Sequence, residues 1–319
     1  KISETTLGNE NEILEIPSLP PVLQTFLGKS SIERILIPNG TEKNYDASFN
    51  TLVSDEIRLY FTLTRRIATQ IRTSTNLSIE PQMVRIPSGC FLVGSSETQV
   101  AQFISDGIDK DIVEREFPQC EIELPEYFIG KYLFTNLEYR EFIRDTKYRS
   151  PIRWNGDDYP EGESDHPVVN ISWISAVAYT NWLSQKTGNA YRLPTEFEWE
   201  KAARGEHAYI YPWGNNANFK NANLFETGIG KATPVGNFSP QGDSLYGCAD
   251  MIGNVWEWCF DWFDANRYKK TSRDGGLLYQ DNTSESYRVI RGGSYINSVK
   301  IARCASRNRL QPYDSDDSL

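Results

Sequence analysis

From Pro81 to Leu319 the apolar runs are short, and turns rich in glycine, proline and asparagine separate them. Glycine and proline interrupt regular elements, and asparagine favours turns, so this pattern predicts many short strands joined by loops. We expect an α+β fold in which two main helices lie among these strands. A chain of 319 residues has room for one such large domain, or for one domain and a smaller module.

Three stretches have strand character. Residues 83–95 predict a hairpin that turns at Pro87-Ser-Gly89, residues 127–136 predict a second strand, and residues 166–172 predict a third that leads into a helix.

The first main helix is predicted at residues 173–186, and Gly188 suits its end. The second is predicted after Thr195, where Thr195 and Glu198 form a capping box and Gly205 stops the helix. A shorter helix is expected after Thr135 or Asn136. The apolar residues that the first and the shorter helix should bury are Tyr139, Phe142, Ile143, Val177, Ala178, Trp182 and Leu183.

Residues 1–80 differ from the rest of the chain. They contain no tryptophan, and three prolines interrupt their beginning. Residues 54–71 carry apolar side chains at helical spacing, which predicts an amphipathic helix that either packs on this protein or docks onto another chain. We therefore expect a helical adaptor or docking segment over residues 1–80, linked near 73–78 to a main domain over residues 81–319.

Composition excludes several classes of function. The formal net charge of −10 argues against binding to a nucleic-acid backbone. No run of 18 apolar residues exists to span a membrane, and the N-terminus lacks the apolar core of a signal peptide. Five cysteines without a Cys-x-x-Cys pair indicate buried thiols in a reducing compartment. We expect a cytoplasmic protein, unless the chain, which begins with Lys1, is a processed fragment.

Seven motifs occur in order along the predicted main domain. They are Pro87-Ser-Gly-Cys-Phe-Leu-Val-Gly, Gly130-Lys-Tyr-x-x-Thr-Asn, His166-Pro-Val-Val-Asn-Ile-Ser-Trp, Arg192-Leu-Pro-Thr-Glu-x-Glu-Trp-Glu, Pro212-Trp-Gly-Asn, Gly253-Asn-Val-Trp-Glu-Trp and Arg291-Gly-Gly-Ser-Tyr. Together they resemble the formylglycine-generating-enzyme (sulfatase-modifying factor) family. This resemblance implies a C-type-lectin-like fold. The Gly-Phe-Arg strand with which that family normally closes is missing before Leu319.

Members of the family differ in function, so the fold alone does not decide it. The oxidase branch binds copper through two cysteines soon after Gly-Gly-Ser-Tyr, whereas here Asn297 takes the place of the first and Cys304 matches a structural position. One thiol does not provide the paired thiolates that copper(I) favours, so no copper is expected. A second branch holds iron with histidines of an additional helical domain, and residues 1–80 contain no histidine. A copper-dependent oxidase is the enzymatic alternative.

The tail resembles a third branch, the variable proteins of diversity-generating retroelements. In those proteins a hypervariable ligand-binding surface is framed by fixed arginines, which match Arg303-Cys-Ala-Ser-Arg-Asn-Arg309 here. The residues around this frame can be reached from an asparagine codon by changing adenines only, except Lys300 and Gln311. The resemblance implies a non-catalytic, receptor-like protein. A catalytically dead member with an unvaried interaction surface is the other interpretation that stays open.

The tail combines aromatic and short polar side chains. Tyrosine and tryptophan provide flat contact area at low entropic cost, and asparagine and serine provide adaptable hydrogen bonds. The alternative is that Trp256 and Tyr295 are core aromatics. We expect a protein or another macromolecule as the ligand. The residues predicted to contact it are Tyr295, Ile296, Asn297, Val299, Ile301, Ser306, Asn308, Leu310, Tyr313, Asp314 and Asp316.

The resemblance also implies a structural calcium site. Asp250 and Glu257 would donate carboxylates, and Gly253 and Val255 carbonyl oxygens, to an ion that takes about six to eight oxygen ligands. Alternatively, the two acidic side chains bind backbone amides without a metal. The family's second calcium site would begin at Asn223, but the sequence that follows is too short to complete it.

Four arginines of the tail allow two interpretations, an anion patch or a structural role. Arginines in such a position more often pair with nearby acids, here Asp261 and Asp264, or stack on tryptophan, so a structural role is expected. The four are Arg291, Arg303, Arg307 and Arg309.

Overall fold

The computed structural model describes residues 13–14, 35–36, 80–273 and 286–319. The chain divides into two compact units, residues 1–49 and residues 50–319. In the first unit the described residues are two short antiparallel strands, β1 (Ile13–Leu14) and β2 (Ile35–Leu36). The predicted helix at 54–71 and the linker after it lie outside the described residues, so the helical adaptor remains a prediction.

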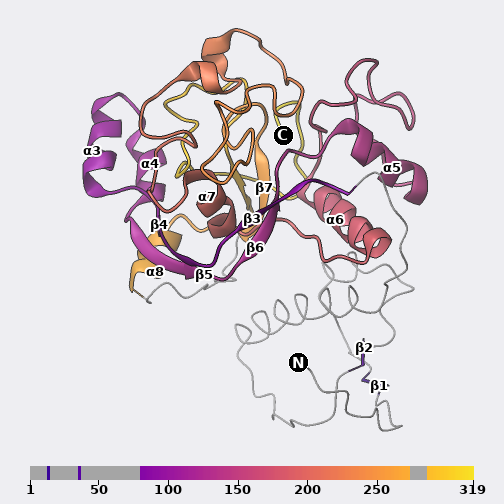
Figure 1. Ribbon diagram of the computed structural model, residues 1–319, viewed down its shortest axis with the longest axis horizontal. Coiled ribbons are helices and arrows are strands. Elements are labelled where there is room, and N and C mark those ends of the chain that lie inside the picture. The colour runs from indigo at the N-terminus through magenta and orange to yellow at the C-terminus, as the bar shows by residue number, and fades with distance from the viewer. Residues whose placement is uncertain (1–12, 15–34, 37–79, 274–285) are drawn as a thin grey trace. The chain divides into compact units, whose positions relative to one another are not determined.

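The described part of the second unit mixes helices with small antiparallel sheets, as the sequence predicts (Figure 1). No helix in this part is long and apolar enough to cross a membrane. Its elements in chain order are β3 (Met83–Ile86), β4 (Gly89–Val93), α3 (Glu97–Ser105), α4 (Lys110–Val113), the 3₁₀ helix η1 (Glu114–Glu116), β5 (Cys120–Leu124), β6 (Tyr127–Gly130), α5 (Asn136–Thr146), α6 (Trp173–Thr187), α7 (Glu196–Arg204), the 3₁₀ helices η2 (Phe219–Asn221) and η3 (Phe225–Thr227), β7 (Glu257–Trp262), α8 (Arg267–Arg273), β8 (Arg288–Arg291) and β9 (Asn308–Leu310).

The hairpin predicted at residues 83–95 is wrong. β3 pairs with β6, and β4 pairs with β5. Ile86 lies opposite Tyr127 in the first pair and Gly89 lies opposite Leu124 in the second, so both pairs share one continuous register. The four strands therefore form one long ribbon that is interrupted in the middle. Pro87 and Pro125 both lie at the interruption, and proline has no N–H to donate to a ladder, so the pairing breaks there without the chain turning back.

The sheet β7–β8–β9 carries the closing segment of the chain. Its three strands are antiparallel in the order of the sequence. Helix α7 packs against β7 and β8, and the core between them is built on Trp199, Cys259, Val289 and Cys304, all fully buried. The tail is thus attached to the centre of the domain.

The three helices predicted within residues 81–319 are confirmed. Thr135 caps α5 and Thr195 caps α7, each in a capping box with a glutamate three residues later. Gly188 ends α6 in the left-handed conformation, with φ of 75°. Helices α5 and α6 lie side by side in Figure 1 and bury an aromatic cluster that includes Phe142 and Trp182, whereas Ala178 is only partly buried.

Two other expectations differ from the structure. The strand predicted at residues 166–172 is wrong, because only Pro167 forms a bridge, to Thr135, and Asn170 has a positive φ of 61° that ends the extended run. Helix α3 was not predicted, although Ser96 and Gln99 form a capping box that marks its start. The strand expected at 127–136 is shorter and ends at Gly130.

Candidate functional site

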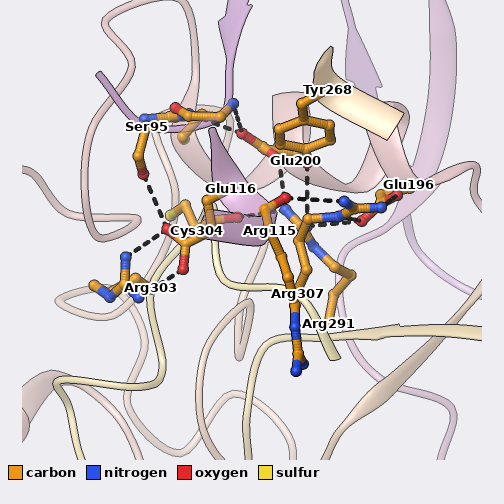
Figure 2. Close-up of polar contacts among 12 residues, drawn as sticks. Ser95, Arg115, Glu116, Glu196, Glu200, Tyr268, Arg291, Arg303, Cys304 and Arg307 are labelled. Carbon is orange, nitrogen blue, oxygen red and sulfur yellow. Dashed lines mark hydrogen bonds and ion pairs between the residues drawn. The ribbon is translucent and has the colours of Figure 1, made fainter. Parts of the chain in front are cut away.

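Three arginines of the closing segment are buried against glutamates from earlier parts of the chain (Figure 2). Arg307 forms two hydrogen bonds with Glu196, from Nε to Oε1 at 2.6 Å and from Nη2 to Oε2 at 2.8 Å. Nη1 of Arg291 donates to the same carboxylate at 3.0 Å. Glu196 is therefore shared by two guanidinium groups.

Glu200, one turn further along α7, is the second centre of this network. Its Oε2 accepts from Nη2 of Arg291 and from the hydroxyl of Tyr268, both at 2.6 Å. Its Oε1 accepts from Nη1 of Arg204 and from the backbone N–H of Gly94, both at 2.7 Å. Burial by itself raises the pKa of Glu200, but the charges of Arg291 and Arg204 outweigh burial and lower the pKa. Glu200 is therefore ionised when it holds these groups.

Arg303 and Glu116 form the third connection. Nη1 and Nη2 of Arg303 donate to the two carboxylate oxygens, each at 2.6 Å. The hydroxyl of Ser95 donates to the same carboxylate at 2.9 Å, and Cζ of Arg303 lies 4.1 Å from the ring centroid of Phe103. These contacts attach the tail to η1 and α3. We call the three arginines and three glutamates the arginine frame.

The expected structural role of the tail arginines is confirmed for the three in the frame. The expected acid partners are wrong, because Asp261 accepts from the backbone N–H of Glu196 and Asp264 pairs with Lys270. The frame glutamates lie between 91 and 187 residues from their arginines, so no local pattern indicates the pairing. Arg309, the fourth arginine, is exposed and lies outside the frame.

The loop after β8 is closed by Asn297. Its Oδ1 accepts from the backbone N–H and the hydroxyl of Ser294, at 2.9 and 3.0 Å, and its carbonyl accepts from the N–H of Phe225 at 2.9 Å. Asn297 was predicted to contact ligand, but its side-chain oxygen is already used to hold this loop.

Glu226 is a contact of the tail that sequence reasoning missed. Its Oε1 accepts from the hydroxyl of Ser298 at 2.7 Å and from the N–H of Val299 at 3.1 Å. Nζ of Lys300 donates to the carbonyl of Asp106 at 3.0 Å. The loop is thus attached to η3 on one side and to the end of α3 on the other.

The last residues return to the middle of the domain. The N–H and Nδ2 of Asn170 donate to the carbonyl of Asp316 and to Oδ1 of Asp317, at 3.0 and 2.6 Å. The N–H of Trp256 donates to the carbonyl of Ser318 at 2.7 Å. Trp256 is 8% exposed and belongs to the core, as the alternative interpretation of this residue predicts.

The predicted ligand-contact residues divide into three groups by exposure. The exposed residues are Ile296, Tyr313, Asp314 and Asp316; the exposed fraction of the residue is 58% for Ile296 and 74% for Tyr313. Tyr295, Asn297, Val299, Ile301, Asn308 and Leu310 are half-buried. Ser306 is buried, with 3% exposed, because it lies between two frame arginines, and its inclusion in an exposed surface is wrong.

The predicted calcium turn depends on tight backbone geometry. Asp250 has a φ of 55°, and its Oδ2 accepts from the N–H of Gly236 at 2.6 Å. Gly253 has a φ of 76°, and a Cβ there would lie 2.4 Å from the carbonyl oxygen of Asn223. Only glycine allows the chain to pass at this position.

Two carboxylates and two backbone carbonyls of this turn are candidate ligands for a cation. Oε1 of Glu257 is shielded from solvent and has no close hydrogen-bond partner among the described residues, although the indole N–H of Trp199 interacts with this carboxylate and opposes the rise that burial causes in its pKa. Burial, with repulsion from Asp250, raises the pKa of Glu257 to about 8, and burial raises the pKa of Asp250 to about 6. The carbonyls of Gly253 and Val255 accept no backbone hydrogen bond from the described part of the chain.

The acidic groups alone do not complete a metal site. Among the described residues no group of three or more His, Cys, Asp or Glu side chains could hold a metal ion. A calcium ion at this turn would therefore need backbone and water oxygens in addition to the two carboxylates.

A cavity of about 810 Å³ lies beside this turn and has a mostly apolar lining. Glu257 and Trp256 line it from the turn, Phe128 lines it from β6, and Leu319 lines it from the chain end. Glu257 is half-buried, and this cavity lies next to it.

The thiol at the family's structural position is not poised for chemistry. Burial raises the pKa of Cys304 to about 12, so its thiol is protonated at neutral pH. The carbonyl of Cys304 accepts from Nη2 of Arg291 at 2.6 Å, which ties this residue to the arginine frame.

Comparisons with known proteins identify the family. The model of the sulfatase-modifying factor enzyme 1-like domain matches residues 68–319. The chain is 28% identical to the formylglycine-generating enzyme of Mus musculus over 296 residues, which cover 75% of this chain and 73% of that protein. It is 29% identical to the inactive C-alpha-formylglycine-generating enzyme 2 of Bos taurus, with 74% and 85% covered. The family thus includes active and inactive members.

Solved structures show the fold. The structure of PvdO from Pseudomonas aeruginosa has a TM-score of 0.61 and 23% identity, with 77% of this chain and 94% of that chain covered. Treponema denticola variable protein 1 has a TM-score of 0.55 and 22% identity, with 77% and 95% covered. The α+β, C-type-lectin-like fold expected from the sequence is confirmed.

Proposed function

This chain belongs to the sulfatase-modifying factor enzyme 1-like family, and we propose that it is a non-catalytic member of that family. It would bind a protein or another macromolecule through its closing segment. The contact surface would be formed by the exposed residues Ile296, Tyr313, Asp314 and Asp316, with Tyr295 and the other half-buried tail residues at its edge. Similarity in fold to a variable protein of Treponema denticola supports this proposal.

The arginine frame is the observation that carries the proposal. Arg303 and Arg307 anchor the backbone on both sides of Ser306, while Ile296 and Tyr313 are 58% and 74% exposed. A rigid support under exposed aromatic and aliphatic side chains lowers the entropy cost of binding. The frame also allows Ile296 and Tyr313 to change, because neither contributes to the frame contacts.

The surface can be tested with a displayed random-peptide library selected on the intact protein. Selected peptides should lose binding about tenfold or more to Ile296→Ala with Tyr313→Ala, since exposed aromatic and aliphatic anchors dominate such contacts. Phe128→Ala is the matched control, because Phe128 is also 58% exposed but lies on β6. Peptides that bind all three proteins equally would place recognition elsewhere.

Diversification of the tail is tested in the neighbouring genome. A reverse transcriptase beside a near-copy of the 3′ end that differs at adenines would establish it. Without such a copy, the chain would be a family member with an unvaried interaction surface.

A copper-dependent oxidase is the second candidate, and similarity to the mouse formylglycine-generating enzyme is the observation that favours it. The buried thiol of Cys304 and the position of Asn297 argue against it, because copper(I) favours two thiolates. A copper(I) titration with a peptide-oxidation assay should show no turnover. Turnover would contradict the non-catalytic proposal.

We also propose that the turn of Asp250, Gly253, Val255 and Glu257 holds a structural calcium ion. The two carboxylates and two backbone carbonyls would bind the ion, and its charge would stabilise the ionised form of both buried acids. The ion would link β7 to the loop that precedes it.

Residues 1–80 are proposed to connect this domain to a partner chain or to another domain. The amphipathic spacing at residues 54–71 supports this role. A location in a reducing compartment is supported by five cysteines that are all free thiols.

A further inference from the structure

Two arginines outside the arginine frame lie beside one aromatic ring. Cζ of Arg309 is 4.9 Å and Cζ of Arg115 is 5.9 Å from the ring centroid of Phe263. Cζ of Arg309 is also 5.0 Å from the ring centroid of Tyr287, which is 38% exposed. Within the described residues neither guanidinium forms an ion pair, although the chain carries a net charge of −10.

A third guanidinium, that of Arg307, lies against the same ring. Cζ of Arg307 is 5.1 Å from the centroid of Phe263, and Nη1 of Arg307 donates to the carbonyl of Arg115 at 2.9 Å. Arg307 is neutralised by Glu196, whereas Arg115 enters the network in Figure 2 only through its backbone. Among the described residues, the guanidinium groups of Arg115 and Arg309 have no carboxylate partner.

Burial and the charge of Arg309 both act on the charge of Arg115. Burial lowers the pKa of Arg115, and repulsion from Arg309 lowers it further. Asp111 and Asp109 oppose this effect, but both are exposed residues at the start of α4, where solvent screens their charges. A bound anion would remove the repulsion between the two guanidinium groups.

The arrangement favours an anion with more than two oxygens. In this protein the carboxylate of Glu116 is held by the two nitrogens of Arg303, and the carboxylate of Glu196 is shared by Arg291 and Arg307. A phosphate group has three or four oxygens and can accept from two guanidinium forks at once. A phosphate group can therefore offer separate oxygens to each of the two guanidinium forks beside the aromatic ring.

Arg309 points to the opposite face of β9 from Asn308 and Leu310, two half-buried residues at the edge of the proposed ligand surface. It lies between them in the sequence, and alternate side chains of a strand point to opposite faces. Arg309 pairs in register with Val289, on the face that packs against Phe263.

We infer that Arg115 and Arg309 form an anion-binding site against Phe263, and that its ligand is a phosphate group, either free or carried by a phosphorylated side chain of a partner. Ligand oxygens accept hydrogen bonds from both guanidinium groups, and the aromatic ring fixes their positions.

The test is a ³¹P NMR titration of inorganic phosphate with the full chain, at constant ionic strength set with chloride. Wild type should change the phosphate signal saturably, and Arg115→Gln and Arg309→Gln should each weaken binding by about tenfold or more, because each loses a charged donor pair. Arg149→Gln is the matched control: Arg149 is exposed and forms no ion pair among the described residues, so affinity should not change. Arg309→Lys keeps the charge but loses the fork and should bind more weakly than wild type.

A phosphoserine peptide and the same peptide with serine separate the two sources of phosphate. Tighter binding of the phosphopeptide than of inorganic phosphate assigns the site to a phosphorylated partner, and equal binding assigns it to free phosphate. An unsaturable response of wild type, or an equal loss in Arg149→Gln, overturns the site. Ile296→Ala with Tyr313→Ala should leave phosphate binding unchanged, so this result is independent of the proposed ligand surface.

Discussion

At the scale of single residues, the molecule depends on charges that water does not reach. Arg291, Arg303 and Arg307 are each at most 1% exposed. A buried charge without a partner is costly, and each of these groups is compensated by two-nitrogen contacts with a glutamate or by a shared carboxylate. The contacts are directional. They therefore neutralise the charges of the arginines and also define where the tail backbone lies.

The two neighbouring arginines 307 and 309 should differ in their contribution to stability. Arg307→Met leaves Glu196 short of its main partner, and we expect the free energy of unfolding to fall by about 3–5 kcal/mol. Arg309→Met removes an exposed group and should cost less than about 1 kcal/mol. Urea denaturation of both variants measures the difference. Equal losses would mean that the buried pairs do not stabilise the tail.

Two glycines with similar backbone angles should respond differently to alanine. Gly228 has a φ of 70° with no atom within 4 Å of a Cβ, so Gly228→Ala should cost only the left-handed conformation, about 1–2 kcal/mol. Gly253 has a φ of 76°, and a Cβ there would also meet the carbonyl of Asn223 at 2.4 Å, so Gly253→Ala should cost more. Thermal denaturation distinguishes the two, and a smaller effect at Gly253 would contradict the close approach.

At the scale of elements, local sequence signals and long-range pairing behave differently. The capping boxes at Thr135 and Thr195 involve residues three apart, and both helices begin where the sequence predicts. The ribbon of β3 to β6 pairs two segments whose prolines, Pro87 and Pro125, are about 38 residues apart. The first segment alone resembles a hairpin, because its own proline suggests a turn and its partner strands lie further along the chain. Strand order therefore needs the partner strand, whereas helix starts do not.

The two capping glutamates should have opposite pH dependence. Burial raises the pKa of Glu198, but two hydrogen bonds from Arg192, at 2.6 Å each, outweigh it and lower the pKa below the usual 4.5. Its contribution is therefore complete above pH 4.5 and is lost as pH falls through the lower, folded value. Burial raises the pKa of Glu138 above 4.5 in the folded state. The folded state therefore loses stability as pH rises from 4.5 towards this raised pKa, because the buried carboxyl becomes ionised.

The measurement is the free energy of unfolding of wild type, Glu198→Gln and Glu138→Gln between pH 3 and pH 7, since glutamine does not titrate. The advantage of wild type over Glu198→Gln should shrink below pH 4.5, and its advantage over Glu138→Gln should shrink above it. The same trend in both variants would mean that Arg192 does not decide the sign.

At the scale of the whole molecule, the closing segment contacts many other parts of the domain. It reaches η1 through Arg303, η3 through Val299 and the segment before α6 through Asp316. These contacts are all within one compact unit. The exposed residues of the tail therefore rest on a support assembled from the entire domain, which suits a surface that binds without moving.

Removal of calcium should lower the melting temperature. If the turn at Asp250 and Glu257 binds the ion, a chelator should lower the melting temperature by about 5 °C or more, since saturating ligand adds about 2–3 kcal/mol. Glu257→Gln removes one charged ligand and should respond much less to the chelator. A wild-type melting temperature unchanged by the chelator would leave the two acids as hydrogen-bonding groups of the loop.

Sequence by itself determined the features that depend on neighbouring residues: the helix starts at Thr135 and Thr195, the helix end at Gly188 and the order of motifs that indicates the family. Tertiary structure alone decided the partners of the tail arginines, the burial of Ser306 and the pairing of the ribbon strands. The physical reason is distance along the chain. A cap or a positive φ is settled within a few residues, whereas a buried charge needs a counter-charge that the fold brings from as far as 187 residues away.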